Sequence, residues 1–394
     1  MTQSGSTPKL SFKDSYGLSD DEDLFRRTVR EFAEQEIMPI AAEHDESGEF
    51  PHATIKGMAD LGLFGLTLPE EYGGVGAGSV ESALAMEEIA RADAVHALAL
   101  SVSLSLVAEP ILRFGSAAQK DRYLPKLASG EWIGSYCLSE PGSGSDAAGM
   151  QTRATRNGDD WILNGTKAWV SNAGEAGIYL VYAISNPEKP KGKNVSAFLI
   201  EADNPGLRLG APEKKLGIKA STTRLVFLED CRVSSDAVLG DVDLGFRIAM
   251  ATLDAGRIGI AAQSLGIAQR ALDESLTYAK DRKAFDRRIA DFQAIQWMLA
   301  EMALKVEASR LLILRAARLR QAGLPITKEA SMAKLHASEA ANFCADRAVQ
   351  IHGGYGYSRE YPVEKLFRDA RITTIYEGTS EIQRLVISRQ ILAD

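Results

Sequence analysis

The spacing of apolar residues changes twice along this chain, and this change constrains the fold more than any other feature of the sequence. Helical spacing dominates from Ser19 to about residue 128, and Ser19, followed by acidic residues, is a suitable N-cap for the first helix. Phe25, Val29 and Phe32 then share one face, as in an amphipathic helix. The first third of the chain is therefore predicted to be helical.

The segment after Gly130 has the composition of β-strands. Its β-branched and aromatic runs include WIL (161–163), IYLVYAIS (178–185), VSAFLIE (195–201) and RLVFLED (224–230). The dipeptides Asn157-Gly158 and Asn164-Gly165 are of the hairpin type. Because no helical segment separates these strands, the pattern favours an antiparallel barrel or sandwich over a parallel βαβ sheet.

From about Gly245 to the end the spacing is helical again. The stretch FQAIQWMLAEMALKVEASRLLILRAARLRQAG (292–323) carries apolar residues at three- and four-residue steps, which predicts long packed helices. A chain of 394 residues exceeds the size at which one hydrophobic core stops growing, so we expect two or three domains that share interfaces. The predicted fold class is α+β, in the order helices, β domain, helices.

Charge and cysteine content exclude several classes of protein. The net charge of -8 argues against a nucleic-acid surface or an anionic-membrane surface, since both need positive potential. We find no leader segment at the N-terminus and no run of eighteen uncharged apolar residues, so we expect a cytoplasmic protein without membrane insertion. Cys137, Cys231 and Cys344 form no CxxC pair, and the histidines have no metal-ligand spacing, so we expect buried thiols and no metal.

Two loop segments carry unusual residue types. CLSEPGSGSDAAG (137–149) offers hydroxyls and backbone amides to an anion or a polar ring, although composition alone slightly favours an inter-domain linker. It contains neither GxSxG nor GK[ST], so it indicates neither a hydrolase elbow nor a P-loop. EEYGGVGAG (70–78) does not have GxGxxG spacing and is predicted to be a surface loop.

The second informative segment is QIHGGYGYSREYPVEKLFRDARITTIYEGTSEIQRLVISRQIL (350–392), in which Glu377 precedes a helix break at Gly378. By spacing alone, an acidic residue beside a glycine is usually only solvated.

Together these two segments resemble the signatures of the acyl-CoA dehydrogenase family, in its short-chain, butyryl-type branch. Further matching segments are LNGTKAWVSN (163–172), KKLGIKAST (214–222), TLDAGRIGIAAQSLGIAQ (252–269) and DRKAFDRRIADFQAIQ (281–296). The resemblance implies an N-terminal helical domain (1–130), a middle antiparallel β-barrel domain (131–242) and a C-terminal four-helix bundle (243–394). FAD would lie where the three domains meet.

The resemblance also implies which residues contact FAD. Tyr136, Cys137, Leu138 and Ser139 would line the isoalloxazine ring, with Gly144 and Ser145 at the pyrophosphate and Trp169 and Ser171 on the other side of the ring. Arg282, Phe285, Gln293, Gln350, Gly353 and Gly354 would contact the FAD of a neighbouring subunit, while Thr379 and Glu381 hold the chain's own FAD. This sharing implies a homotetramer built as a dimer of dimers. Without the resemblance, Trp169 would be read as a core residue and Arg282 as a solvated cation.

Glu377 is the candidate catalytic base for oxidation of a short acyl-CoA thioester to its 2,3-enoyl form. The base would take the α-proton while the β-hydrogen leaves as hydride, and burial should adjust its pKa to this task. The Glu377 backbone N–H and a flavin hydroxyl would hold the thioester carbonyl. Some relatives carry the base in the helix that here contains Gly256, a residue that cannot ionise.

The resemblance assigns the substrate contacts less specifically. They are Ser145, Ser185, Asp254, Arg257, Gly378 and Arg389. An ordinary helix salt bridge explains Asp254 and Arg257 equally well. Val102 and Ser103 would form the cavity floor, and the absence of arginine from SVSLSLVAEP disfavours a second carboxylate on the substrate. Straight and branched short acyl groups both remain open.

Two alternative functions, an acyl-CoA oxidase and a flavin-free scaffold, differ from a dehydrogenase in their partners. The resemblance implies that electrons pass to electron-transferring flavoprotein, whereas an acyl-CoA oxidase would pass them to oxygen. The length of the chain disfavours the oxidase, because related oxidases usually carry an extra C-terminal domain. A flavin-free helical scaffold is the non-enzyme alternative, and it would be expected to lack the base or the flavin loop.

Overall fold

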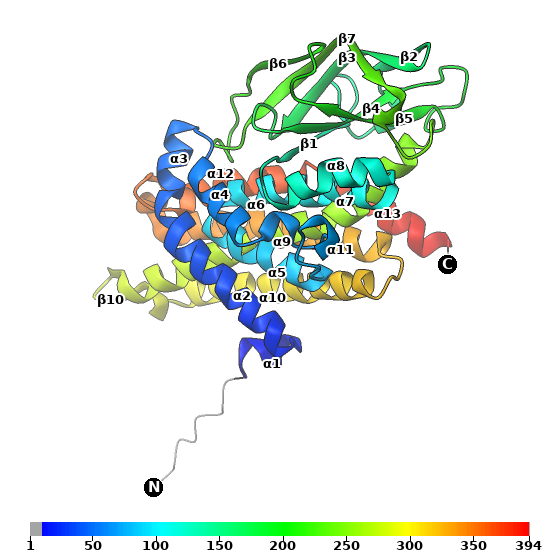
Figure 1. Cartoon of the computed structure of the whole chain (residues 1–394). Coiled ribbons are helices and arrows are strands. Elements are labelled where there is room, and N and C mark those ends of the chain that lie inside the picture. The colour runs from blue at the N-terminus through cyan, green and yellow to red at the C-terminus, as the bar shows by residue number, and fades with distance from the viewer. Residues whose placement is uncertain (1–9, 394) are drawn as a thin grey trace.

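The computed structural model describes residues 10–393, and Figure 1 shows their arrangement as a β domain seated on one side of a large group of helices. Residues 1–9, part of the N-terminal stretch in which we expect no leader segment, lie outside this range. The order of helices, strands and helices agrees with the prediction.

The first group of helices ends at Ala128, at the predicted place. Its α-helices are α1 (Phe12–Tyr16), α2 (Asp20–Phe32), α3 (Ala41–Ser47), α4 (His52–Asp60), α5 (Ser79–Ala92), α6 (Ala94–Ser101), α7 (Glu109–Phe114) and α8 (Ala117–Ala128). Ser19 caps α2, because its hydroxyl accepts from the Glu22 N–H while the Glu22 carboxylate accepts from the Ser19 N–H. Val29 is buried on the inner face, as predicted. The segment after Glu70–Tyr72 is an irregular loop, also as predicted.

A continuous apolar helix runs through the middle of this group. It joins α6 to α7 through η5 (Val102–Ala108), which has π-helical hydrogen bonding. By length and composition, Ala94–Phe114 could cross a membrane, but 89% of its apolar window is buried inside the protein. We therefore describe this stretch as a core helix.

The β domain is one eight-stranded sheet, ordered β6-β7-β3-β2-β4-β5-β8, with β1 added beside β4. Its strands are β1 (Gly134–Cys137), β2 (Arg153–Asn157), β3 (Asp160–Ser171), β4 (Ile178–Ile184), β5 (Val195–Glu201), β6 (Leu207–Pro212), β7 (Thr223–Ser234) and β8 (Val238–Leu239). Most neighbours are antiparallel, as predicted, while β1 and β2 each pair with β4 in parallel. Residues 178–183 of β4 are all buried, so this strand forms the centre of the domain.

Only one of the two predicted hairpin dipeptides makes a turn. Gly158 and Asp159 connect β2 to β3 directly after Asn157, which pairs with Asp160, and Gly158 has a φ of 64°. The prediction for Asn164-Gly165 is wrong, because both residues lie inside β3 at a register shift against β7. A Cβ at position 165 would lie 2.5 Å from Thr152 Oγ1, so glycine is needed for a bulge and a close approach.

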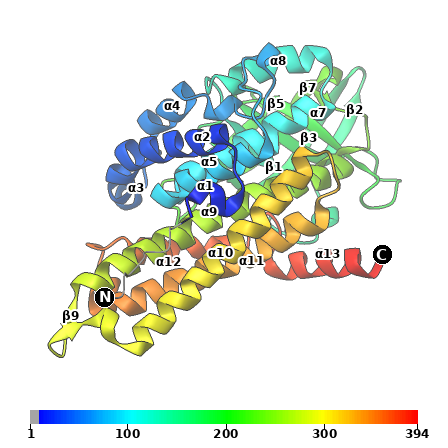
Figure 2. The ribbon, with the colours of Figure 1, turned by 90° about the horizontal axis from the view of Figure 1, so that it is seen from below.

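The C-terminal helices are long and packed side by side, as Figure 2 shows for α9, α10 and α11. They are α9 (Gly245–Asp281), α10 (Gln293–Gln321), α11 (Thr327–His352), α12 (Val363–Ala370) and α13 (Ser380–Ala393). A small hairpin of β9 (Lys283–Ala284) and β10 (Arg287–Arg288) connects α9 to α10. The three cysteines are buried and unpaired, as predicted.

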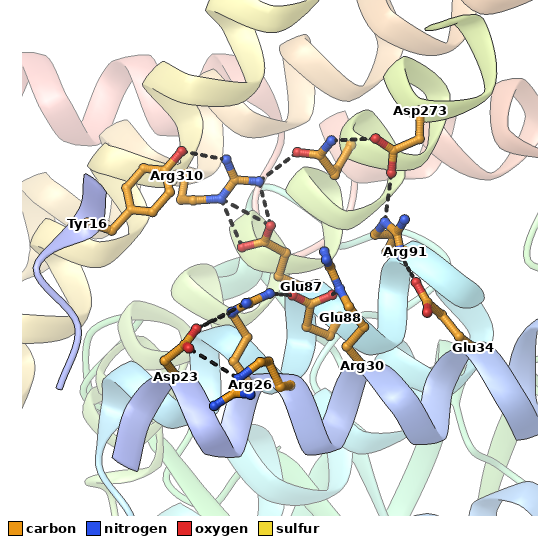
Figure 3. Close-up of polar contacts among 12 residues, drawn as sticks. Tyr16, Asp23, Arg26, Arg30, Glu34, Glu87, Glu88, Arg91, Asp273 and Arg310 are labelled. Carbon is orange, nitrogen blue, oxygen red and sulfur yellow. Dashed lines mark hydrogen bonds and ion pairs between the residues drawn. The ribbon is translucent and has the colours of Figure 1, made fainter. Parts of the chain in front are cut away.

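Buried ion pairs fasten the first helices to the last (Figure 3). Two neighbouring carboxylates on α5 point in different directions: Glu87 binds Arg310 of α10 at 2.6 Å, and Glu88 binds Arg26 of α2 at 2.9 Å. Arg310 also donates to the Tyr16 hydroxyl and to the Gln269 side chain on α9. Because each carboxylate has its own cation, α2, α5, α9 and α10 are joined through charges that are almost fully buried.

A second buried cluster joins all three parts of the chain. The Lys365 ammonium on α12 lies 2.6 Å from Asp93 Oδ1 and 2.7 Å from Asp369 Oδ2. Asp93 also binds His96 at 2.7 Å, and Asp369 accepts a hydrogen bond from the Ile218 N–H of the β domain. Burial would raise the pKa of Asp93, but the Lys365 and His96 partners hold it below its ordinary value.

Replacing Lys365 with Met should destabilise the protein by about 3–5 kcal/mol, because two buried carboxylates would lose the cation that they share. The matched control is Lys56→Met, which removes an exposed pair with Asp60 and should cost less than about 1 kcal/mol. Urea unfolding of both variants would measure the difference. Equal midpoints for the two variants would contradict this role of Lys365.

Candidate active site

Glu377 lies in the loop between η10 (Arg371–Thr374) and α13, in a conformation that is uncommon for its residue type. Its φ is 50°, in the left-handed region. Both carboxylate oxygens are shielded from solvent and, among the described residues, neither has a hydrogen-bond partner. A buried carboxylate without a donor is costly, so this arrangement indicates a functional group rather than a structural one.

The walls around Glu377 come from all three parts of the chain. A Cβ built on Gly256 of α9 would lie 2.4 Å from Glu377 Oε2 and 2.8 Å from Leu106 Cδ2 of η5. Tyr136 of β1 is also close, since the Glu377 charge contributes to raising the pKa of the Tyr136 hydroxyl, after burial and the neighbouring Tyr182. A side chain at position 256 would therefore displace the Glu377 carboxylate and Leu106, and glycine avoids both contacts.

The electrostatic environment makes Glu377 suitable as a base near neutral pH. Burial raises the pKa of its carboxyl to about 7, and the positive charges of Lys334 and Arg257 partly oppose that effect. A base with a pKa close to the working pH is favourable for proton transfer.

Polar side chains that the sequence analysis did not identify hold the Glu377 loop in place. The Gly378 carbonyl accepts from Lys334 Nζ at 2.7 Å and from Gln383 Nε2 at 2.9 Å. Gln383 Nε2 also donates to the Glu377 carbonyl, and the Tyr376 hydroxyl donates to Gln263 of α9. The sequence does indicate that Lys334 is unusual, because this lysine falls among alanines on one helical face, where a buried apolar residue is expected.

The segments expected to enclose a flavin ring lie side by side. The Ser139 carbonyl accepts from the Ala168 N–H at 2.9 Å, and the Ser135 hydroxyl donates to the Ser171 carbonyl at 2.8 Å. These bonds put the end of β1, with Tyr136, Cys137, Leu138 and Ser139, beside the end of β3. Trp169 is 65% exposed at a φ of 58°, so it is not the core residue that a strand tryptophan usually is.

A buried ion pair secures the loop that follows β1. Lys167 Nζ lies 2.8 Å from Glu140 Oε1 and donates to the Leu138 carbonyl. Glu140 also accepts from the Gln151 and Thr152 N–H groups. The loop beyond it is open at Gly144, where a Cβ would meet nothing within 4 Å, and Ser145 is exposed.

These residues fit FAD by their chemistry. The fit rests on an exposed indole at Trp169, an open glycine backbone at Gly144, and two buried hydroxyls, of Ser221 and Thr222, without partners among the described residues. Thr222 adjoins the end of β3, since its carbonyl accepts from the Asn172 N–H. A planar ring with a polar edge and a pyrophosphate would use such groups.

The expected substrate contacts are spread over several elements. Arg257 binds Asp254 at 2.6 Å, and Asp254 also accepts from the Thr327 hydroxyl, so the helix salt bridge is present. The Arg257 guanidinium lies close to Gly378 as well, because a Cβ on Gly378 would be 3.8 Å from its Nη2. The Ser185 hydroxyl donates to Asp243, while Arg389 is exposed on α13.

The remaining expected FAD contacts lie in two separate places on one chain. Arg282, Gly353 and Gly354 line a cavity of about 560 Å³ near the β9–β10 hairpin. Gln293 and Gln350 are exposed. Phe285 there is 89% exposed. Thr379 and Glu381 line a different cavity of about 270 Å³. One chain therefore does not bring these two groups into one cavity.

Comparison with protein families gives matches along nearly the whole chain. The family models for the acyl-CoA dehydrogenase N-terminal, middle and C-terminal domains match residues 19–131, 135–231 and 243–392. The bovine (Bos taurus) short-chain specific acyl-CoA dehydrogenase, mitochondrial, is 50% identical over 378 residues, which cover 96% of this chain and 92% of the relative.

Solved structures agree with this match. Butyryl-CoA dehydrogenase from Megasphaera elsdenii has a TM-score of 0.93 and 42% identity, and the match covers 95% of this chain and 99% of that one. A chain from a structure described as electron transferring flavoprotein of Acidaminococcus fermentans has a TM-score of 0.94 and 42% identity, covering 98% and 100%.

Members of this family are FAD-dependent oxidoreductases, and the resemblance expected from the sequence is confirmed. The matches to all three domains, together with the extended identity to a short-chain enzyme, show that this chain belongs to the acyl-CoA dehydrogenase family and is of the short-chain type.

Proposed function

We propose that Glu377 removes the α-proton of a short-chain acyl-CoA as the chain oxidises this substrate to the trans-2-enoyl-CoA. The observation that carries the proposal is the buried Glu377 carboxylate, which has no hydrogen-bond partner among residues 10–393 and whose pKa burial raises to about 7. A group in this state can accept a proton near neutral pH, and it adjoins Tyr136, at one end of the expected flavin segment.

Bound FAD would supply the hydride acceptor for the β-hydrogen, while Glu377 takes the α-proton and the C–C single bond becomes a double bond. Tyr136, Leu138, Ser139, Trp169 and Ser171 would hold the ring, and Gly144 and Ser145 the pyrophosphate. The Gly378 peptide, fixed by Lys334 and Gln383, keeps the Glu377 carboxylate aimed at the substrate. Exclusion of water from this carboxylate strengthens its interaction with the reacting carbon.

The residues that we expect near the acyl group favour a short, uncharged substrate. Val102 and Ser103 are buried in the π-helical stretch η5, and Leu106 of the same stretch packs next to Gly256. No arginine or lysine occurs between residues 101 and 110, so a second substrate carboxylate would find no partner there. Arg257, Asp254, Ser185 and Arg389 remain our candidates for contacts with the CoA moiety.

We further propose that the electrons leave through electron-transferring flavoprotein. A similar chain occurs in a structure whose title names such a protein, and this supports the proposal. The chain spans 92% of the short-chain bovine relative, so it aligns with a dehydrogenase over almost the full length of that enzyme. An oxidase is the competing assignment.

A homotetramer with shared FAD sites is our proposed assembly. Trp297, Leu304 and Leu311 repeat at seven-residue steps along α10 and are 64%, 69% and 52% exposed. An apolar stripe of this kind on a helix marks a contact surface with another chain. The division of the expected FAD contacts between two separate cavities also supports sharing, because a second chain could bring its Arg282 to the Thr379 side.

Glu377→Gln should bind FAD and butyryl-CoA but reduce the flavin at least about a hundredfold more slowly, because the amide cannot accept the α-proton. Anaerobic stopped-flow measurement of flavin bleaching tests this. Glu229→Gln, which alters an exposed ion pair with Arg208, is the matched control and should bleach at the normal rate. Turnover retained in Glu377→Gln would remove this residue from its proposed role.

The electron acceptor can be tested on the enzyme after anaerobic reduction by butyryl-CoA. On admission of air, flavin absorbance should recover slowly and little peroxide should form, whereas added electron-transferring flavoprotein should restore the absorbance quickly. Rapid recovery with stoichiometric peroxide in air alone would instead identify an oxidase.

Leu304→Asp should break the tetramer, because it places a charge in the middle of the α10 stripe. Light scattering should give four times the 42.6 kDa of one chain for the wild type and a smaller species, poor in FAD, for the variant. Leu61→Asp, at an exposed leucine outside the stripe, should remain tetrameric. A monomeric wild type with full FAD content would contradict the proposed assembly.

A further inference from the structure

Lys334 is a buried cation directly behind the Glu377 loop. It lies on α11 with none of its surface exposed, among Ala330, Ala337 and Ala341, which are buried as well. Its ammonium donates to the Gly378 carbonyl at 2.7 Å. Within residues 10–393, no carboxylate lies within 4.0 Å of this ammonium, so Lys334 has no direct ion-pair partner in the part of the chain described.

A buried ammonium without a salt bridge is unfavourable unless a nearby negative charge compensates for it. Glu377 supplies that charge. Burial lowers the pKa of Lys334 to about 8, and among the charges that act on it, the Glu377 carboxylate raises it most. In turn, Lys334 is the strongest influence that lowers the pKa of Glu377. The two groups therefore stabilise each other's charged forms without a direct hydrogen bond.

The other titratable groups near Glu377 are either paired with a carboxylate or neutral. Arg257 of α9 faces Glu377, but its guanidinium is paired with Asp254 at 2.6 Å, so its positive charge is partly cancelled. Tyr136 of β1 and Tyr376 of the loop have pKa values raised well above the ordinary value, chiefly by burial, so both are neutral at working pH.

Two further carboxylates act on Lys334 rather than on Glu377. Glu381 of α13 and Glu339 of α11 both raise the pKa of Lys334, and Glu339 is itself paired with Arg384. The nearby η5 segment has no charged residue, and its Leu106 side chain lies next to Gly256. Within the described residues, Lys334 is thus the cation beside Glu377 that has no carboxylate of its own.

We propose that Lys334 is a positioning residue for the oxidation, whose ammonium fixes the Gly378 peptide and favours the ionised form of the Glu377 carboxylate. This inference rests on the proposed role of Glu377 as the base. It assigns Lys334 two effects that can be separated: a hydrogen bond that sets the position of the loop, and a charge that sets the pH at which the base is active.

The test compares Lys334→Met with Lys334→Arg, which keeps the charge. Anaerobic flavin bleaching by butyryl-CoA is followed from pH 5 to 10 in the FAD-loaded enzymes. In Lys334→Met the rising limb of the rate profile should move to higher pH by about one unit, a loss of about tenfold at pH values below the limb. Lys334→Arg should keep a midpoint close to that of the wild type.

Lys280→Met is the matched control, because Lys280 is an exposed lysine on α9 away from the loop, and its profile should be unchanged. A second measurement does not depend on activity. The infrared band of the protonated Glu377 carboxyl, assigned by its absence in Glu377→Gln, should titrate at higher pH in Lys334→Met. If Lys334→Met does not fold, Lys334→Gln provides the same loss of charge with a polar side chain.

Unshifted midpoints in both the rate profile and the infrared titration of the uncharged variant would overturn the role of Lys334. Failure of the proposed function would look different. An active Glu377→Gln variant would contradict the proposed role of Glu377 as the base. An inactive Glu377→Gln variant together with an unshifted Lys334→Met profile would contradict only the role of Lys334.

Discussion

The candidate site depends on buried charge that crosses domain boundaries, and the Lys365 cluster is the clearest case. One ammonium is shared between Asp93 from the first helices and Asp369 from the last, and Asp369 also binds the backbone of the β domain at Ile218. Such a cluster is favourable only when all its members are in place, since any of them alone would be an uncompensated buried charge. The three domains therefore have one preferred arrangement, and the surroundings of Glu377, which come from all three parts of the chain, form only in that arrangement.

Buried charge also acts, more weakly, around Glu377, the proposed base. A carboxylate in a fully apolar pocket would be protonated at neutral pH, and one in a tight ion pair would be too weak a base to be useful. Glu377 lies between these limits, because Lys334 and Arg257 are near enough to act through space while their hydrogen bonds go elsewhere. The pKa of about 7 results from burial, opposed by two positive charges that make no hydrogen bond to the carboxylate.

Features set by nearby residues were predictable from the sequence, and features set by distant partners were not. The order of helices and strands, the cap at Ser19 and the turn at Gly158 follow from local patterns. The bulge at Gly165 depends on Thr152 and on the pairing with β7, so the dipeptide alone was misleading. In the candidate site, Glu377 is predicted through the resemblance of its motif, but Lys334 and Gln383 bind backbone carbonyls that come close only in the folded chain.

The contact between Gly256 and Glu377 has a consequence for how such a site can change over time. A side chain at position 256 would occupy the same volume as the Glu377 carboxylate in its present position, so the two cannot be there together. An acid added at position 256 would displace the Glu377 carboxylate, and under the proposed mechanism the loss of Glu377 alone would leave no base. Under that mechanism, moving the proposed base from the Glu377 loop to α9 would require paired substitutions or an inactive intermediate sequence.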